Sequence, residues 1–402
     1  MKILFLTPRF PYPLDVGTSL RNFRLLQSAA QEHEVHLLSF LDRPLRIDHL
    51  EAVQSVCAHV ELRPSPPHRI VRRLGGVLGS AWPDMALRRW SPGFAEAVQG
   101  LMQSERYDVV QAEGIEMARY LALSGGAWRV FSEHNVEYLL QRRAFKIDRA
   151  RPRRWPLAAY SHVQAERLAR FERAACHLAD RVLTVSEADA GALRSLAPTG
   201  RYAVVPNAID VDAYPRASER TSRPAILFTG TLDYRPNLDA VRWLLDEILP
   251  HVHMRQPEAR VFVVGRSPAA DVVARGQVDA RIAVTGAVER LEPYWTRSTV
   301  YALPMRGGGG VRFKALEAMA AGLPIVSTRM GMEGIAAEPG VHYLAADSAS
   351  EFGAALVRLL DDAQLRERIA GAAATLVRER YDWRAVAPAL LGVYREFARE
   401  GA

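Results

Sequence analysis

The stretch LPMRGGGGVRFKALEAMAAG, residues 303–322, has the order of a buried strand, a glycine loop and a helix. Its apolar start fits a strand, the glycines Gly307 to Gly310 interrupt regular structure, and apolar residues then return at helical spacing. Glycine lets backbone N–H groups approach an oxyanion closely, and the following helix presents its positive N-terminal end to the same place. The stretch therefore predicts an anion-binding turn in an α/β fold.

Outward from this stretch, short apolar runs alternate with longer segments of helical spacing, a pattern typical of parallel sheets covered by helices. The predicted strands are Lys2 to Leu6, Glu34 to Ser39, His59 to Leu62, Asp108 to Gln111, Trp128 to Ser132, Arg181 to Val185, Tyr202 to Val205, Ala225 to Thr229, Arg260 to Val264, Ile282 to Thr285, Val300 to Leu303, Ile325 to Ser327 and His342 to Leu344. The predicted helices of the second half include Leu238 to Met254, Val311 to Ala321 and Ser350 to Leu360.

A length of 402 residues exceeds one ordinary core and suits two domains with a cleft between them. Residues 207–224 are polar and rich in turn formers, as expected of a linker. We therefore predict an α/β protein of two doubly wound, Rossmann-like domains, residues 1–206 and 225–384, followed by an amphipathic helix within 385–402.

The composition narrows the classes of function. Two cysteines, Cys57 and Cys176, lie far apart outside any CxxC pattern, so we expect no disulfide framework, no metal site and a reducing, cytoplasmic location. No apolar run reaches the length of a membrane span, and the one at Ile3 to Leu6 is too short for a signal peptide. The net charge of +7, mostly from arginine, favours anionic partners such as phosphorylated substrates or anionic lipid. No motif supports nucleic-acid binding.

Two cations and a carboxylate follow the glycine run. Arg312 and Lys314 are predicted in the first helical turn, where a cation is unfavourable unless something negative compensates. Glu317 lies one turn further on the face of Lys314. Cations for phosphate and a carboxylate for ribose hydroxyls suit a nucleoside diphosphate. The alternative is that Lys314 and Glu317 form an ordinary exposed surface pair.

The run from Gly310 to Thr328 resembles the donor-site signature of family 4-like retaining glycosyltransferases of the GT-B class, the glycosyl transferases group 1. Shorter matches cover nearly the whole chain in family order, at Phe5 to Arg21, Ser132 to Asn135, Thr184 to Glu187, Val205 to Asp210, Phe228 to Leu232, Val263 to Arg266 and Val284 to Val288.

The resemblance implies a donor nucleotide held mainly by the second domain, an acceptor held mainly by the first, and sugar transfer without a cofactor or metal ion. It assigns the donor ribose to Glu317, the diphosphate and sugar to the loop 307–311, and the base to a loop at 286–289. It also implies that the last helix crosses back onto the first domain. The donor-site residues expected on this basis are Gly230, Thr231, Gly286, Val288, Arg306, Gly308, Gly309, Gly310, Val311, Arg312, Lys314 and Glu317.

The chain departs from the family pattern at two places. The family motif often has glutamate at both ends of a nine-residue span, but Gly309 stands at the first position, so a side-chain contact to the donor sugar is missing. Many relatives have an arginine and a lysine after the first strand of the second domain, where this chain has Asp233 to Asn237. We expect Arg312 and Lys314 to supply that charge.

The first domain offers acceptor-site candidates at the carboxyl ends of its predicted strands, where open parallel sheets bind ligands. Glu133 and His134 directly follow one strand, and the resemblance favours His134 as a catalytic cleft histidine over a structural one. Glu113 and Glu116 follow another strand. In the loop after the first strand, Gly17 permits close backbone approach and Arg21 could meet an acceptor or a phosphate, although a plain strand-to-helix connection needs no ligand.

Two stretches, His68 to Trp90 and Gln141 to Trp155, combine arginine with large apolar side chains. Such a combination suits the surface of a membrane that carries anionic lipid, which would favour a lipid-linked acceptor and peripheral association with the inner membrane face. Solvated loops of an arginine-rich protein are the alternative.

The leading hypothesis is a glycosyltransferase that uses a nucleotide sugar and a glycan or lipid-linked acceptor, as in the biosynthesis of surface polysaccharides or glycoconjugates. A nucleotide-sugar epimerase on the same scaffold is a second hypothesis, because a fold does not fix chemistry. A non-catalytic protein that binds glycan or nucleotide is a third, and Gly309 makes it plausible.

Overall fold

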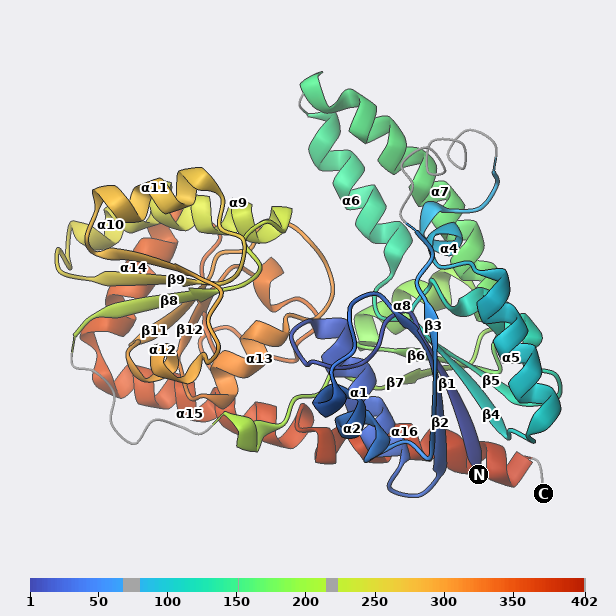
Figure 1. The fold of residues 1–402 in the computed structure, drawn as a ribbon. Helices are drawn as coiled ribbons and strands as arrows, with labels where there is room; N and C mark the ends of the chain where they lie inside the picture. Colours follow the sequence, from blue (N-terminus) through green and yellow to red (C-terminus); the bar gives the residue numbers. More distant parts are fainter. Residues whose placement is uncertain (68–79, 151, 215–222, 401–402) are drawn as a thin grey trace. The chain divides into compact units, whose positions relative to one another are not determined.

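A computed structural model of the chain describes residues 1–67, 80–150, 152–214 and 223–400 (Figure 1). It divides into two compact units, one of Met1–Ala208 with Val386–Ala402 and one of Ile209–Ala385. The predicted linker, 207–224, begins at the first crossing between the units, and its residues 215–222 lie outside the described part. Residues 209–214 pack with the second unit.

The first unit contains a seven-stranded sheet in the order β3-β2-β1-β4-β5-β6-β7, with every neighbouring pair parallel. Its central strands β1 and β4 are buried along nearly their whole length because helices cover both faces. The strands are β1 Lys2–Thr7, β2 Glu34–Leu41, β3 His59–Pro64, β4 Val109–Glu113, β5 Trp128–Ser132, β6 Arg181–Thr184 and β7 Tyr202–Val204. The α-helices are α1 Gly17–Ala29, α2 Ile47–Gln54, α4 Asp84–Arg88, α5 Pro92–Ser104, α6 Glu137–Arg149, α7 Trp155–Leu178, α8 Glu187–Leu196 and the C-terminal α16 Trp383–Glu400.

The second unit contains a six-stranded parallel sheet in the order β10-β9-β8-β11-β12-β13. The strands are β8 Ala225–Thr229, β9 Arg260–Val264, β10 Ile282–Gly286, β11 Val300–Leu303, β12 Ile325–Ser327 and β13 Leu344–Ala345. The α-helices are α9 Arg235–Trp243, α10 Leu249–His253, α11 Ala270–Val278, α12 Glu292–Thr296, α13 Phe313–Ala320, α14 Ala349–Asp361 and α15 Ala363–Arg380. The predicted fold class is confirmed, and each predicted strand is present with ends that differ by no more than two residues.

The predicted helix Leu238 to Met254 is interrupted. Between α9 and α10 the residues Leu244–Ile248 form a π-helical turn. Pro250, near the start of α10, has no N–H to donate to the carbonyl four residues before it, so the regular hydrogen-bond ladder cannot pass through this point. The sequence pattern showed the apolar face but not the change of helical pitch.

The C-terminal helix α16 packs against the first unit. Phe397 stacks on Trp128 at a ring separation of 4.9 Å, and Glu396 pairs with Arg181 at 2.7 Å. Tyr394 is fully buried. This helix therefore belongs to the core of the first unit, although the chain reaches it only after the second.

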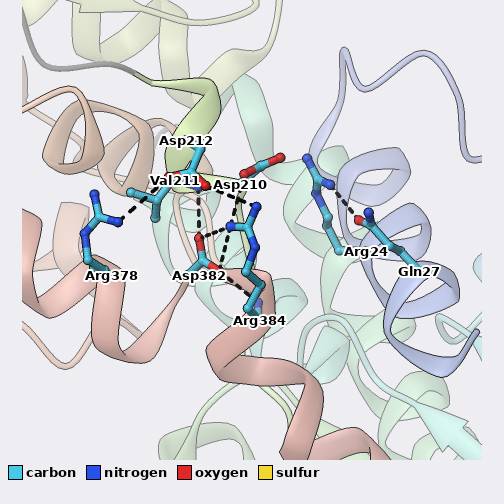
Figure 2. Close-up of polar contacts among 8 residues, drawn as sticks. All are labelled: Arg24, Gln27, Asp210, Val211, Asp212, Arg378, Asp382 and Arg384. Atoms are coloured by element: carbon cyan, nitrogen blue, oxygen red, sulfur yellow. Dashed lines mark hydrogen bonds and ion pairs between the residues drawn. The ribbon is translucent and has the colours of Figure 1, made fainter. Parts of the chain in front are cut away.

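The two chain segments that pass between the units are hydrogen bonded to each other within the second unit. The N–H of Ile209 donates to the carbonyl of Tyr381 at 2.9 Å, and the N–H of Trp383 donates to Ile209 at 2.9 Å. Beside this bridge, Asp382 accepts from the N–H groups of Val211 at 3.1 Å and Arg384 at 2.9 Å (Figure 2). Asp382 thus fixes both segments where they leave the second unit.

Replacing Asp382 with alanine should lower the free energy of unfolding of the second unit by about 1–3 kcal/mol, because its carboxylate is only 8% exposed and two backbone donors lose their acceptor. Asp212→Ala is the matched control. Its carboxylate is 64% exposed and pairs with the exposed Arg384, so we expect a change below about 0.5 kcal/mol. Urea denaturation measures both variants, and equal losses would contradict the assignment.

Candidate functional site

Each sheet has one point at which the strand order reverses, and open α/β sheets bind ligands beyond the carboxyl ends of the strands at such points. In the second unit this point lies between β8 and β11. The loop after β8 leads into α9, and the loop after β11 leads into α13, the helix that follows the glycine run. In the first unit it lies between β1 and β4.

Two glycines bring the loops after β8 and β9 into contact. A Cβ atom on Gly265 would lie 1.8 Å from the carbonyl oxygen of Gly230, so no other residue fits there. A Cβ on Gly230 would in turn lie 2.8 Å from the side-chain nitrogen of Asn237 and 3.2 Å from Nζ of Lys314. The absence of both Cβ atoms lets side chains of α9 and α13 meet above the end of β8.

Lys314 is the second residue of α13, and its ammonium turns toward the end of β8. Nζ donates to the carbonyl oxygen of Thr229 at 3.2 Å and to Oδ1 of Asn237 at 2.7 Å, and it lies 4.8 Å from the centre of the Phe228 ring. Burial and, to a smaller extent, the charge of Arg312 lower the pKa of Lys314 to about 7, against the opposite effect of Glu317. Because both acceptors are neutral, a bound anion would favour the charged form.

Glu317 lies one turn further along α13 and is half-buried. Its Oε1 accepts a hydrogen bond from the hydroxyl of Tyr214 at 3.2 Å. Burial raises the pKa of Glu317, while the bond from Tyr214 and the charge of Lys314 oppose this change. Lys314 is also half-buried, so the exposed-pair alternative does not describe these two side chains.

Arg312 does not lie in the first turn of the helix, which corrects the sequence prediction. Its backbone is extended, and α13 begins at Phe313. The buried guanidinium folds back onto the glycine loop, where it donates to the carbonyl oxygens of Gly309 and, at 3.2 Å, of Gly307. Gly308 and Gly310 have φ of +91° and +74°, which side chains rarely adopt. Arg312 therefore holds the shape of the loop.

The other predicted donor-site residues occupy different environments. Gly286 ends β10 and accepts from the N–H of Gly265 at 3.1 Å, so the loop that carries the half-buried Val288 adjoins the switch point. Thr231 follows β8, and its carbonyl accepts from Asn237 at 2.9 Å. Val311 is buried. Arg306 instead forms a two-point pair with Asp239 of α9 at 3.0 and 3.1 Å, on the surface.

In the first unit, four side chains form a continuous hydrogen-bonded chain. The hydroxyl of Tyr394 donates to Oε1 of Gln111 at 2.6 Å, and Nε2 of Gln111 donates to Oε1 of Glu113 at 2.6 Å. The other oxygen of Glu113 meets Nε2 of His134 at 2.8 Å. Tyr394, Gln111 and Glu113 are fully buried, whereas His134 retains 14% exposure.

This hydrogen-bonded chain determines which ring nitrogen of His134 donates to Glu113. Burial acts to raise the pKa of Glu113, but the hydrogen bond and charge of His134 and the charge of Arg21 hold it below its usual value. An ionised carboxylate only accepts hydrogen bonds, so Nε2 of His134 carries a proton in this contact, and in a neutral ring Nδ1 would be the acceptor. Nδ1 lies on the side of Gly114, where a Cβ atom would be 3.7 Å away.

Three side chains of the first unit that were predicted to face a ligand are buried instead. Arg21 was predicted to reach a ligand, but it is 2% exposed because α1 packs on the sheet, and it donates to the carbonyl of Val205 and to Asn207, both at 3.0 Å. Glu113 is a buried partner of His134 rather than a direct acceptor ligand. Glu133 does not overlook a cleft, because it is 2% exposed. Gly17, which was predicted to lie in the loop after the first strand, is the first residue of α1.

A cavity of about 730 Å³ lies at the opposite, amino-terminal edge of the first sheet, where Met1, Asp108 and Trp128 contribute to its lining. Parallel sheets bind ligands at their carboxyl ends, so we do not place the functional site there.

Within the described ranges, no group of three or more His, Cys, Asp or Glu side chains could hold a metal ion. In the same ranges, no helix is both long and apolar enough to span a membrane.

The arrangement agrees with comparisons to known proteins. Residues 223–362 match the family described as "Glycosyl transferases group 1", and residues 17–213 match "Glycosyltransferase Family 4". The chain belongs to the family 4-like glycosyltransferases. The sequence-based recognition of this family is thereby confirmed.

The curated relatives include a phosphatidyl-myo-inositol mannosyltransferase of Mycobacterium tuberculosis, 30% identical over 49% of this chain and 55% of that protein. They also include a D-inositol 3-phosphate glycosyltransferase of Acidothermus cellulolyticus, 30% identical over 55% of this chain and 54% of that protein. The matched region spans about half the length of these relatives.

Solved structures share the GT-B fold over nearly the whole chain. The match to the sucrose-phosphate synthase of Thermosynechococcus elongatus covers 100% of both chains, with a TM-score of 0.74 at 17% sequence identity. Anabaena HepE, solved in complex with UDP, covers 98% of this chain and 100% of its own with a TM-score of 0.68 at 15% identity.

In this family member, sequence reasoning missed Asn237 and Tyr214, which contact two of the candidate site residues. Asn237 lies in the segment where many relatives carry cations, and that departure was the signal available in the sequence. Tyr214 lies far from Glu317 along the chain, so no local pattern connects the two residues. Both side chains position the charged residues of α13.

The stability of the protein should depend on the protonation of Lys314. The unfolded chain keeps this proton up to about the ordinary lysine pKa of 10.5, whereas the folded protein releases it near 7. Between these values the unfolded state binds more protons, so this group makes stability rise with pH. Relative to Lys314→Met, the wild-type protein should therefore gain free energy of unfolding from pH 7 toward 10. Denaturation at several pH values tests this, and a constant difference would contradict it.

The protonation of His134 should depend on Glu113. Glu113→Gln removes the carboxylate, and an amide can either donate or accept, so the ring nitrogens should no longer be restricted to one tautomer. Nitrogen-15 NMR of labelled histidine should show changed Nδ1 and Nε2 shifts for His134 and unchanged shifts for the exposed His59. An unaltered His134 spectrum would show that Glu113 does not fix the tautomer.

Proposed function

We propose that the chain transfers a sugar, with retention of anomeric configuration, from a nucleoside diphosphate sugar to a glycan or lipid-linked acceptor without a metal ion. The observation that carries this proposal is the environment of Lys314 at the switch point of the second sheet. A lysine with a lowered pKa, held by neutral acceptors beside a glycine loop and the start of a helix, suits a diphosphate.

The donor would be bound as follows. The loop from Gly308 to Gly310 and the start of α13 would cradle the diphosphate, and Lys314 would pair with it. Glu317, one turn along the helix, would accept hydrogen bonds from the ribose hydroxyls through its carboxylate. The loop with Gly286 and Val288 would contact the base. Gly309 offers only backbone groups to the sugar.

In the transfer step, the bond between the anomeric carbon and the diphosphate oxygen breaks, and the electron pair stays on the diphosphate. The charge of Lys314, supported by Arg312 through the loop, would stabilise this leaving group. The acceptor hydroxyl oxygen would then bond to the same face of the anomeric carbon, and its proton would pass to the departing diphosphate oxygen. His134 would bind a donor or acceptor hydroxyl through Nδ1. We propose no covalent glycosyl intermediate.

The acceptor class follows from charge and from the relatives. The basic net charge of +7 favours anionic molecules. The names of two relatives refer to a phosphatidyl-myo-inositol and an inositol 3-phosphate, which both carry a phosphate. We therefore propose a phosphate-bearing glycan or lipid as acceptor, a cytoplasmic site of action and a role in making polysaccharides or glycoconjugates.

Thermal unfolding with UDP, GDP, ADP or dTDP tests the donor site. At least one nucleotide should raise the unfolding temperature, since a ligand at a hundred times its Kd stabilises the native state by about 2.7 kcal/mol. Lys314→Met should abolish this rise, whereas Arg242→Gln, which changes an exposed ion pair on the neighbouring helix, should retain it.

Turnover is then measured as release of the nucleoside diphosphate from the matching sugar. Binding without turnover would favour the alternative of a non-catalytic nucleotide-binding protein, which the glycine at position 309 specifically supports. The proposal fails if no nucleotide raises the unfolding temperature and Lys314→Met leaves turnover unchanged.

A further inference from the structure

The helices α6 and α7 form a hairpin in the first unit, and its turn lies away from the sheet (Figure 1). The end of α6, the short helical turn Pro152–Arg154 and the start of α7 make up this turn. We call residues 146–157, apart from the undescribed residue 151, the hairpin tip. None of the reactions proposed above uses it.

The hairpin tip exposes apolar side chains that a water-facing turn does not need. Trp155 is 62% exposed, Leu157 54% and Ile147 42%. Exposed single apolar residues are ordinary, but three within eleven positions of one turn, one of them tryptophan, form a small apolar cluster. The cluster is convex rather than a groove.

The exposed charges of the hairpin tip are positive. Between positions 138 and 165 the sequence has seven arginines and lysines and a single acidic residue, Asp148. Asp148 is buried and pairs with Arg154 at 3.2 Å, so its charge is turned inward. Lys146, Arg149 and Arg153 are exposed. The tip thus presents cations around its apolar side chains.

The polar atom of Trp155 already has a partner inside the turn. Its Nε1–H donates to the carbonyl oxygen of Arg149 at 3.3 Å. The indole can therefore leave water without losing a hydrogen bond, which is otherwise the main cost of burying a tryptophan. The same bond ties the start of α7 to the end of α6.

We propose that the hairpin tip docks onto a membrane surface that contains anionic lipid, with Trp155, Leu157 and Ile147 entering the headgroup region. A convex apolar point ringed by cations matches such a surface. A nucleic acid would use the cations and an aromatic ring but would gain nothing from Leu157 and Ile147, and a protein interface of ordinary size needs a larger area. The link to a lipid-linked acceptor rests on the proposed function, whereas docking itself does not.

The other arginine-rich stretch, His68 to Trp90, is a weaker candidate. Its residues 68–79 lie outside the described part of the chain. Trp90 stacks against Tyr120 at 5.0 Å, and Arg119 lies 4.1 Å from Trp90 and 4.4 Å from the partly exposed Trp82. These rings are engaged with the protein, so Trp82 provides a control for Trp155.

Sedimentation with lipid vesicles, without any nucleotide sugar, tests the proposal. The protein should bind vesicles of phosphatidylglycerol and phosphatidylcholine, and bind pure phosphatidylcholine much less. Arg149→Gln with Arg153→Gln should weaken binding about fivefold for each cation removed. Trp155→Ala with Leu157→Ala should weaken it on the order of tenfold. Arg106→Gln, at an exposed site of the same unit, and Val278→Ser, 89% exposed in the second unit, are the controls.

Quenching of tryptophan fluorescence by brominated lipid locates the contact. Quenching should be lost in Trp155→Phe and kept in Trp82→Phe. The proposal is wrong if the protein binds the two kinds of vesicle equally, or binds neither. It is also wrong if the tip and control variants bind vesicles alike, or if Trp82→Phe is the variant that loses quenching. Turnover with a soluble acceptor should be unchanged by the tip variants, so failure of docking and failure of the proposed reaction are separate results.

Discussion

The ammonium of Lys314 is held at the carboxyl end of β8 by two neutral oxygens, those of Thr229 and Asn237, and the rest of the candidate donor site is arranged around this contact. It requires glycine at position 230, where a Cβ atom would meet both Asn237 and Lys314. Gly265 must also lack a side chain, so that its loop can approach Gly230. The site is therefore limited first by space and then by charge, because no carboxylate of the described residues lies within hydrogen-bond distance of the half-buried Lys314.

In the first unit the buried ionisable group is an acid, and it has a basic partner. There a buried carboxylate, Glu113, has its charge satisfied by His134 on one side and an amide on the other. The hydroxyl that orients the amide comes from Tyr394, on the helix that the chain forms last. A polar network that is satisfied throughout can be buried at little cost and holds its members rigidly. The geometry of His134 thus depends on residues at both ends of the sequence.

Much of the fold could be predicted because it depends on local patterns. Runs such as Ile3 to Leu6 and Val261 to Val264 are apolar on both faces, as buried parallel strands must be, and the turn residues between them mark the ends. The donor loop was recognisable for a similar reason, since four glycines before a helix have few purely structural uses. The interruption of the helix at Leu244–Ile248 could not be read from the apolar pattern, because that pattern hardly changes when one turn widens.

The roles of individual polar residues were harder to predict, since burial and partners depend on tertiary packing. Arg21 and Glu113 come after predicted strands, as ligand-binding residues do, yet both are buried among other side chains. Tyr214 and Asn237 reach the charged residues of α13 from other segments, and no spacing along the sequence connects them.

We propose that the switch point of the second sheet binds a diphosphate through Lys314, whose pKa is lowered to about 7 in the free protein. The chain has only three lysines, Lys2, Lys146 and Lys314, so lysine side-chain NMR can follow each of them during a pH titration. We expect the Lys314 resonance, assigned with Lys314→Met, to titrate near pH 7 in the free protein and at clearly higher pH with a bound nucleoside diphosphate. A Lys314 resonance that titrates like an ordinary lysine, or that a nucleotide leaves unmoved, would contradict the claim.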